Sequence, residues 1–223
     1  MVGNWDGYAV EWARLHGGFD PRRAGPAVRR WLHSAYTMGS VLARVGIPPA
    51  AVTGAGVALS ASAPVLAGQS TGRLVLAAVF VLLSAVADSV DGAVAVISGR
   101  TSRLGYLYDS LADRISEACW LVAFWVVGAS APLVVLVGAV CWLHEYVRAR
   151  AAAAGMREIG VVTIGERPTR VVLAVTGLLL AGASGLVQSD LPAGVITVMS
   201  AIWLTLALFG LAQLLAAVRH ALR

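Results

Sequence analysis

Four aspartates lie in an otherwise apolar stretch of the sequence, residues 87–118. Asp88 and Asp91 are three residues apart, and Asp109 and Asp113 are four apart, so each pair falls on one face of a helix. A carboxylate in hydrocarbon is costly unless it is paired, hydrated or bound to a metal. Four neighbouring carboxylates also repel one another unless some are protonated or a cation lies between them. Oxygen ligands of this kind suit Mg²⁺ or Mn²⁺ rather than zinc.

A short turn is predicted between the two aspartate pairs. The intervening residues 97–105, ISGRTSRLG, contain Gly99 and Gly105 together with serine and threonine, which are typical of turns. Two antiparallel helices joined there would bring the pairs together at the cytoplasmic end of a helix bundle. Small residues around the acids favour close helix packing, or allow an anionic ligand to approach the backbone at Gly92 and Gly105.

The composition indicates an all-α integral membrane protein. Of the 223 residues, 58% are hydrophobic and 13% are charged, and the mean hydropathy is +0.78. Soluble domains carry about 25% charged residues. Six apolar segments each approach the ~20 residues that a transmembrane helix needs. They are 52–69, 73–98, 105–128, 131–152, 169–188 and 193–218. The first 24 residues lack the pattern of a cleaved secretion signal.

The positions of the arginines predict the orientation in the membrane. All 17 basic residues are arginine, and of those in the loops and tails only Arg73 falls on the side opposite the rest. The positive-inside rule therefore places both termini in the cytoplasm of a multi-pass cell-membrane protein. The net charge of +5 would also favour attachment to anionic lipid. The arginines on the cytoplasmic side are Arg14, Arg22, Arg23, Arg29, Arg30, Arg44, Arg100, Arg103, Arg157, Arg167, Arg219 and Arg223.

The segment 25–45 is predicted to be an amphipathic helix at the membrane interface. It is too polar to cross a bilayer, but its apolar residues recur at helical spacing. Pro48 and Pro49 are expected to separate it from the first span. We therefore divide the chain into a cytoplasmic segment, 1–45, and a six-helix membrane domain, 46–223. The apolar residues are Trp31, Leu32, Ala35, Met38, Val41 and Leu42.

One extended motif resembles the signature of the CDP-alcohol phosphotransferases, membrane enzymes that move a phosphatidyl or similar group from a CDP-linked donor to an alcohol. The motif is Asp88-x2-Asp91-Gly92-x2-Ala95-x9-Gly105-x3-Asp109-x3-Asp113. The segment GIPPAAVTGAG, 46–56, is similar to the one that leads into the first span of this family. EYVRARAAAAG, 145–155, and GERPTR, 165–170, resemble acceptor-side segments of the actinobacterial phosphatidylinositol phosphate synthases.

The resemblance implies a metal-dependent mechanism. The four aspartates would hold two Mg²⁺ or Mn²⁺ ions against the pyrophosphate of a donor such as CDP-diacylglycerol, and CMP would leave. Asp113 would also act as the general base on the acceptor hydroxyl. The residues expected to bind the donor are Thr53, Asp88, Gly92, Ala95, Arg100, Arg103, Gly105 and Asp109. The family also implies a homodimer, and we expect no nucleic-acid partner.

Four arginines lie where the acceptor pocket of the family would be: Arg148, Arg150, Arg167 and Arg170. They could bind the phosphate of a phosphorylated polyol such as inositol phosphate or glycerol phosphate, or they could be ordinary positive-inside anchors. Arg157 is interpreted as an anchor. The sequence does not choose between the two polyols.

Val96 departs from the family motif, which usually has arginine directly after the position of Ala95. Arg100 or Arg103 would then supply the donor-phosphate contact, and an arginine introduced at position 96 would be expected to strengthen donor binding. A weak or inactive family member is one alternative. A divalent-cation transporter is another, although transporters usually place acids near the bilayer midplane in two similar halves, and we find no such repeat.

Overall fold

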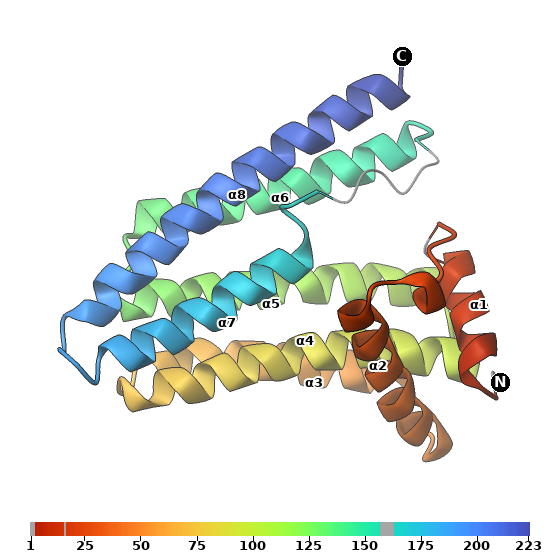
Figure 1. Cartoon of the computed structure of the whole chain (residues 1–223), viewed down its shortest axis with the longest axis horizontal. Helices are drawn as coiled ribbons and strands as arrows, with labels where there is room; N and C mark the ends of the chain where they lie inside the picture. Colours follow the sequence, from red (N-terminus) through yellow and green to blue (C-terminus); the bar gives the residue numbers. More distant parts are fainter. Residues whose placement is uncertain (1–2, 16, 157–162) are drawn as a thin grey trace. The chain divides into compact units, whose positions relative to one another are not determined.

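A computed structural model describes residues 3–15, 17–156 and 163–223, and the described residues form helices joined by turns and loops, without a strand (Figure 1). The predicted all-α fold class is therefore confirmed. The helices are α1 (Trp5–Leu15), the 3-10 helix η1 (Pro21–Arg23), α2 (Pro26–Arg44), α3 (Pro49–Ala67), α4 (Gly72–Ser98), α5 (Arg103–Val127), α6 (Ala131–Ala153), α7 (Arg167–Ser184) and α8 (Leu191–Ala221).

Four helices in the described part of the chain, α3, α4, α6 and α8, are long and apolar enough to cross a membrane. Their length and composition indicate a membrane protein. Helices α5 and α7 cover the predicted spans 105–128 and 169–188, but they do not meet the same criterion. Charged residues lower their hydropathy, as Asp113, Arg114 and Glu117 do in α5. The six-span topology stays a prediction.

The chain divides into two compact units. Unit 1 comprises Met1–Ala58 and Leu83–Asp113, and unit 2 comprises Leu59–Leu82 and Arg114–Arg223. Helices α3, α4 and α5 each contribute residues to both units. All four aspartates of the motif belong to unit 1, whereas the four predicted acceptor arginines belong to unit 2. The boundary predicted between residues 45 and 46 stays a prediction.

In unit 1, helix α2 packs closely against α4. A Cβ atom added to Gly39 would lie 2.8 Å from Cβ of Ala93, so the glycine allows this approach. Leu32 and Ala35 are buried on the same side of α2, whereas Trp31 and Val41 are exposed. The helix predicted at 25–45 is thus present, and its location at a membrane interface stays a prediction. The core of unit 1 contains Tyr8, Ala35, Val52, Val90, Ala93, Val94, Val96 and Ile97.

Helix α1 was not predicted from the sequence. Oδ1 of Asn4 accepts a hydrogen bond from the backbone N–H of Gly7 at 2.9 Å, as a helix cap does. The rings of Trp5 and Tyr8 pack against Tyr36 of α2, with centroid distances of 5.6 and 5.3 Å. The spacing of Trp5, Tyr8 and Trp12 along one helical face was the signal that could have identified this helix.

The predicted turn between the aspartate pairs is confirmed. Gly99 ends α4 in a left-handed conformation with φ +68°, which suits glycine. The backbone N–H of Arg100 donates to the carbonyl of Ala95 at 2.9 Å, closing the last turn of α4. Oγ of Ser102 then caps α5 by accepting from the N–H of Gly105 at 2.9 Å. These bonds fix the start of α5, which carries Asp109 and Asp113.

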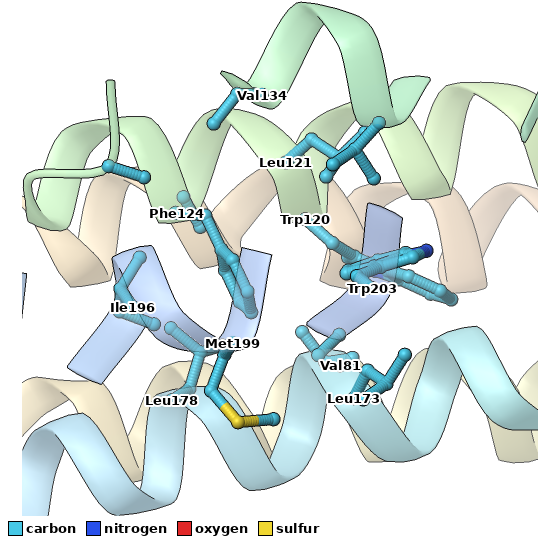
Figure 2. Packing of buried hydrophobic residues seen from close by; sticks show 14 of the residues in the cluster. Val81, Trp120, Leu121, Phe124, Val134, Leu173, Leu178, Ile196, Met199 and Trp203 are labelled. Carbon is cyan, nitrogen blue, oxygen red and sulfur yellow. The ribbon is translucent and has the colours of Figure 1, made fainter. Parts of the chain in front are cut away.

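Unit 2 has a large apolar core between its helices (Figure 2). The rings of Phe124 and Trp203 meet edge to face, with centroids 5.8 Å apart. Helix α8 packs against both α6 and α7. The buried Trp120 donates its indole N–H to Oγ of Ser60 at 3.1 Å. The labelled residues of Figure 2, including Leu178 and Ile196, fill the space between these helices.

Candidate functional site

Three of the predicted metal ligands converge in unit 1. Asp88 of α4 and Asp109 and Asp113 of α5 each offer a carboxylate oxygen, and these atoms all lie within 4.8 Å of one another. The three residues are partly exposed. Oxygen-only donors at this spacing suit a hard divalent cation. The aspartate spacing in the sequence therefore identified a real cluster.

Asp91 differs from the other three aspartates. Its residue is 5% exposed, and its Oδ2 accepts a hydrogen bond from Oγ1 of Thr53 at 2.5 Å. Thr53 lies on α3, so this bond ties α3 to α4 within unit 1. The ligand role of Asp91 and the donor contact of Thr53 stay predictions.

The other predicted donor-binding residues are spread over α4, the turn and the start of α5. A Cβ added to Gly92 would meet nothing within 4 Å, and this residue is exposed on α4. Ala95 lies one turn further along the same helix. Arg100 in the turn and Arg103 at the start of α5 are both exposed. Gly105 follows in the first turn of α5, so these residues lie on the segments that carry the aspartates.

Val96 is buried, with 5% of its surface exposed, in the apolar core of unit 1 that also contains Tyr8 of α1. An arginine at this position would put a charge into that core. The gain in donor binding expected from this substitution therefore does not follow.

Unit 2 contains a buried network of charged side chains. Nη1 of Arg170 lies 3.0 and 3.1 Å from the two carboxylate oxygens of Glu117, and each of these residues is at most 2% exposed. Nη2 of Arg170 donates to Glu145 at 3.0 Å, and its Nε donates to the carbonyl of Gly165 at 2.7 Å. Arg114 adds a bond to Glu117 at 3.0 Å. The acceptor contact predicted for Arg170 stays a prediction, and these bonds already use its donor groups.

The other predicted acceptor arginines of unit 2 differ in their surroundings. Nη2 of Arg148 donates to Glu166, and its side chain is 29% exposed. The guanidinium of Arg167 lies 5.8 Å from the ring centroid of Trp120, which is a cation–π distance. Arg150 is exposed near the end of α6. Arg157 lies outside the described residues.

The roles of Glu117, Glu145 and His144 were not predicted from the sequence. Each lies within an apolar helix, where an ionisable side chain needs a partner. This requirement could have indicated that the three residues have partners. The sequence did not indicate which partners, because the network joins residues of α5, α6 and α7 that are far apart in the sequence.

Comparison with known proteins identifies the family. A family model described as CDP-alcohol phosphatidyltransferase matches residues 47–217. The phosphatidylinositol phosphate synthase of Mycobacteroides abscessus is 32% identical over 158 residues, which are 66% of this chain and 69% of that protein. The family model covers more than half of the chain. The chain therefore belongs to the CDP-alcohol phosphatidyltransferase family and is a transferase.

Solved structures also resemble the chain. A crystal structure of the Mycobacterium tuberculosis phosphatidylinositol phosphate synthase with CDP-DAG bound matches with a TM-score of 0.66 and 27% identity, covering 82% of this chain and 92% of that one. A structure of that synthase in complex with manganese and citrate matches with a TM-score of 0.65 and 27% identity, covering 83% and 88%. The predicted family resemblance is thus confirmed.

The buried pairing of Arg170 leads to a prediction about the free energy of unfolding. Replacing Arg170 with Met should lower the free energy of unfolding by about 3 kcal/mol or more, because Glu117 loses a buried partner. Arg150→Met, at an exposed position, should have little effect. Thermal unfolding of the purified protein in detergent would measure both. Wild-type stability of Arg170→Met together with weakened acceptor binding would instead make Arg170 a ligand contact.

Proposed function

We propose that this protein transfers a phosphatidyl group from CDP-diacylglycerol to a hydroxyl of inositol phosphate, and that it releases CMP. The convergence of Asp88, Asp109 and Asp113 within 4.8 Å carries the proposal, because this donor set suits the ion that such a reaction needs. The named substrates of the related synthases support the donor and the acceptor. Glycerol phosphate is the alternative acceptor.

The chain's own residues divide the chemistry between them. Asp88, Asp91, Asp109 and Asp113 would hold Mg²⁺ or Mn²⁺, and the related synthase that was solved in complex with manganese supports the choice of ion. When bound, the divalent ions neutralise negative charge on the pyrophosphate of the donor. The binding site for the donor is shaped by Thr53, Asp91 and the small residues Gly92, Ala95 and Gly105. Arg100 or Arg103 binds the donor phosphate, because Val96 stands where the family usually has an arginine.

Asp113 serves as the general base. The acceptor oxygen attacks the phosphorus that carries the diacylglycerol, and the bond from this phosphorus to the oxygen of CMP breaks. The proton of the acceptor hydroxyl passes to the carboxylate of Asp113. Arg148, Arg150 and Arg167 bind the acceptor's phosphate. Glu117 is a poor substitute for this base, because it is buried and bonded to Arg170 and Arg114.

In this proposal the chain crosses the cell membrane six times, with both termini and the active site at the cytoplasmic face. The pairing of the charges that lower the hydropathy of α5 and α7 supports the two additional spans. Glu117 of α5 and Arg170 of α7 pair with each other, so these charges need not face lipid. Helix α2 lies at the interface with its exposed Trp31 and Val41 toward lipid. The active form is a homodimer, as the family resemblance implies.

Metal-dependent CMP release tests the proposed function. Purified protein is incubated with CDP-diacylglycerol and Mn²⁺, and with inositol phosphate, glycerol phosphate or unphosphorylated inositol as acceptor. We expect CMP release with inositol phosphate, its loss on adding EDTA, and its return with excess Mg²⁺ or Mn²⁺. Equal release in chelated buffer would exclude the metal mechanism. Release with glycerol phosphate alone would change the acceptor, and no release with any acceptor would exclude the function.

Gly92 allows a test of donor binding that is separate from folding. Alanine at Gly92 meets no atom of the described residues within 4 Å and is the better helix former by about 1 kcal/mol, so stability should be unchanged or higher. A donor that approaches the backbone there would meet the new methyl group. The donor KM should then rise roughly tenfold, which corresponds to about 1.4 kcal/mol. The acceptor KM should not change.

Gly194→Ala is the matched control for this substitution. Gly194 lies in α8, is exposed, and also has open space around the position of an added Cβ. It should retain the wild-type donor KM. An unchanged donor KM in Gly92→Ala would mean that the donor does not approach this part of α4.

A further inference from the structure

Glu166 is the hydrogen-bonding centre of the short segment that precedes α7. Its Oε1 accepts from the backbone N–H of Thr163 and from Oγ1 of the same residue, each at 3.1 Å. The same oxygen accepts from Nη2 of Arg148 on α6. One carboxylate therefore joins this segment to a predicted acceptor arginine.

Thr163 is held in turn by His144 of α6. Nε2 of His144 lies 2.9 Å from Oγ1 of Thr163, and both residues are at most 2% exposed. Nδ1 of His144 lies 3.4 Å from Nη2 of Arg170, which can only donate. Oε1 of Glu145 lies 3.5 Å from Nδ1 but already receives Nη2 of Arg170 at 3.0 Å.

The hydroxyl of Thr163 sets the direction of these hydrogen bonds, because its single proton goes to the carboxylate of Glu166, which only accepts. Nε2 of His144 therefore carries a proton and donates to Oγ1 of Thr163. Nδ1 then accepts from Nη2 of Arg170. The chain of bonds runs from Arg170 through His144 and Thr163 to Glu166, where Arg148 donates from the other side.

The bond to Glu166 fixes the orientation of Arg148 but uses only part of the N–H groups of its guanidinium. Glu166 binds its Nη2, whereas its Nε is buried and has no hydrogen-bond partner among the residues that the structure describes. The side chain is 29% exposed, so a ligand can reach it. An arginine that is held in place and has N–H groups left over is suited to bind a phosphate.

We propose that Thr163 and Glu166 are positioning residues, which orient Arg148 toward the phosphate of the acceptor through the bonds from His144. This inference rests on the proposed function, which makes Arg148 an acceptor-binding residue. It assigns to the segment before α7 a part in selecting phosphorylated acceptors over neutral ones.

Thr163→Val and Thr163→Ser provide the test. Valine keeps the shape and the backbone N–H but removes the hydroxyl that links His144 to Glu166, whereas serine keeps that hydroxyl. With CDP-diacylglycerol and inositol phosphate, Thr163→Val should raise the acceptor KM roughly three- to tenfold, since the hydroxyl's hydrogen bonds to His144 and Glu166 are both lost. The donor KM and kcat should stay at wild-type values, and Thr163→Ser should restore the acceptor KM.

Thr176→Val is the matched control, because among the described residues the hydroxyl of Thr176 bonds only within its own helix α7, to the carbonyls of Val172 and Leu173. It should leave the acceptor KM unchanged. An unchanged acceptor KM in Thr163→Val, an equal rise in Thr163→Ser, or a fall in thermal stability alone would overturn the positioning role. Wild-type protein that releases no CMP would instead remove the proposed function, and this inference with it.

Discussion

Every charged side chain in an apolar helix of this protein must be compensated by a partner, by water or by an ion. The two units meet this requirement in different ways. In unit 2, Glu117 and Arg170 compensate each other in a buried pair. In unit 1, Asp88, Asp109 and Asp113 converge as like charges and remain partly exposed. Like charges held this close store repulsion that a cation relieves. The first arrangement suits a scaffold and the second suits an ion-binding site.

This difference explains why a transferase can keep so many acids in a hydrophobic chain. The buried network joins α5, α6 and α7 through groups that bond to one another. Arg148, at the edge of this network, is partly exposed and shares Glu166 with Thr163. The scaffold therefore extends to the side chain that we assign to the acceptor.

The sequence predicted the parts of the structure that depend on local spacing. Aspartates three and four residues apart identified the faces of α4 and α5, and Gly99 marked the turn between them. The hydrophobic pattern predicted spans over α5 and α7, but these helices carry charged residues and do not meet the criterion that the other four helices meet. The partners of those charged residues lie elsewhere in the sequence. Charge alone does not distinguish an arginine that binds a phosphate from one that pairs with a buried carboxylate, so the pairing of Arg170 with Glu117 could not be predicted from the sequence.

Three features of unit 1 depended on packing that the sequence does not encode locally. Val96 was treated as a missing phosphate contact, but it belongs to the core that includes Tyr8 of α1. Helix α1 itself was missed, because its aromatic residues pack against α2 rather than continue a membrane-spanning pattern. Asp91 accepts a hydrogen bond from Thr53 of α3, a contact between distant parts of the sequence that the spacing of the aspartates does not predict.

The central claim is that the aspartates of α4 and α5 form a divalent-cation site. Titration of Mn²⁺ into the purified protein, with free Mn²⁺ followed by electron paramagnetic resonance, tests this without donor or acceptor. We predict saturable binding that Asp109→Asn weakens by tenfold or more, on the order of 1.4 kcal/mol. Asp190→Asn, which changes an exposed acid just before α8, should bind Mn²⁺ like the wild type. Equal Mn²⁺ binding by Asp109→Asn and the wild type would contradict the account.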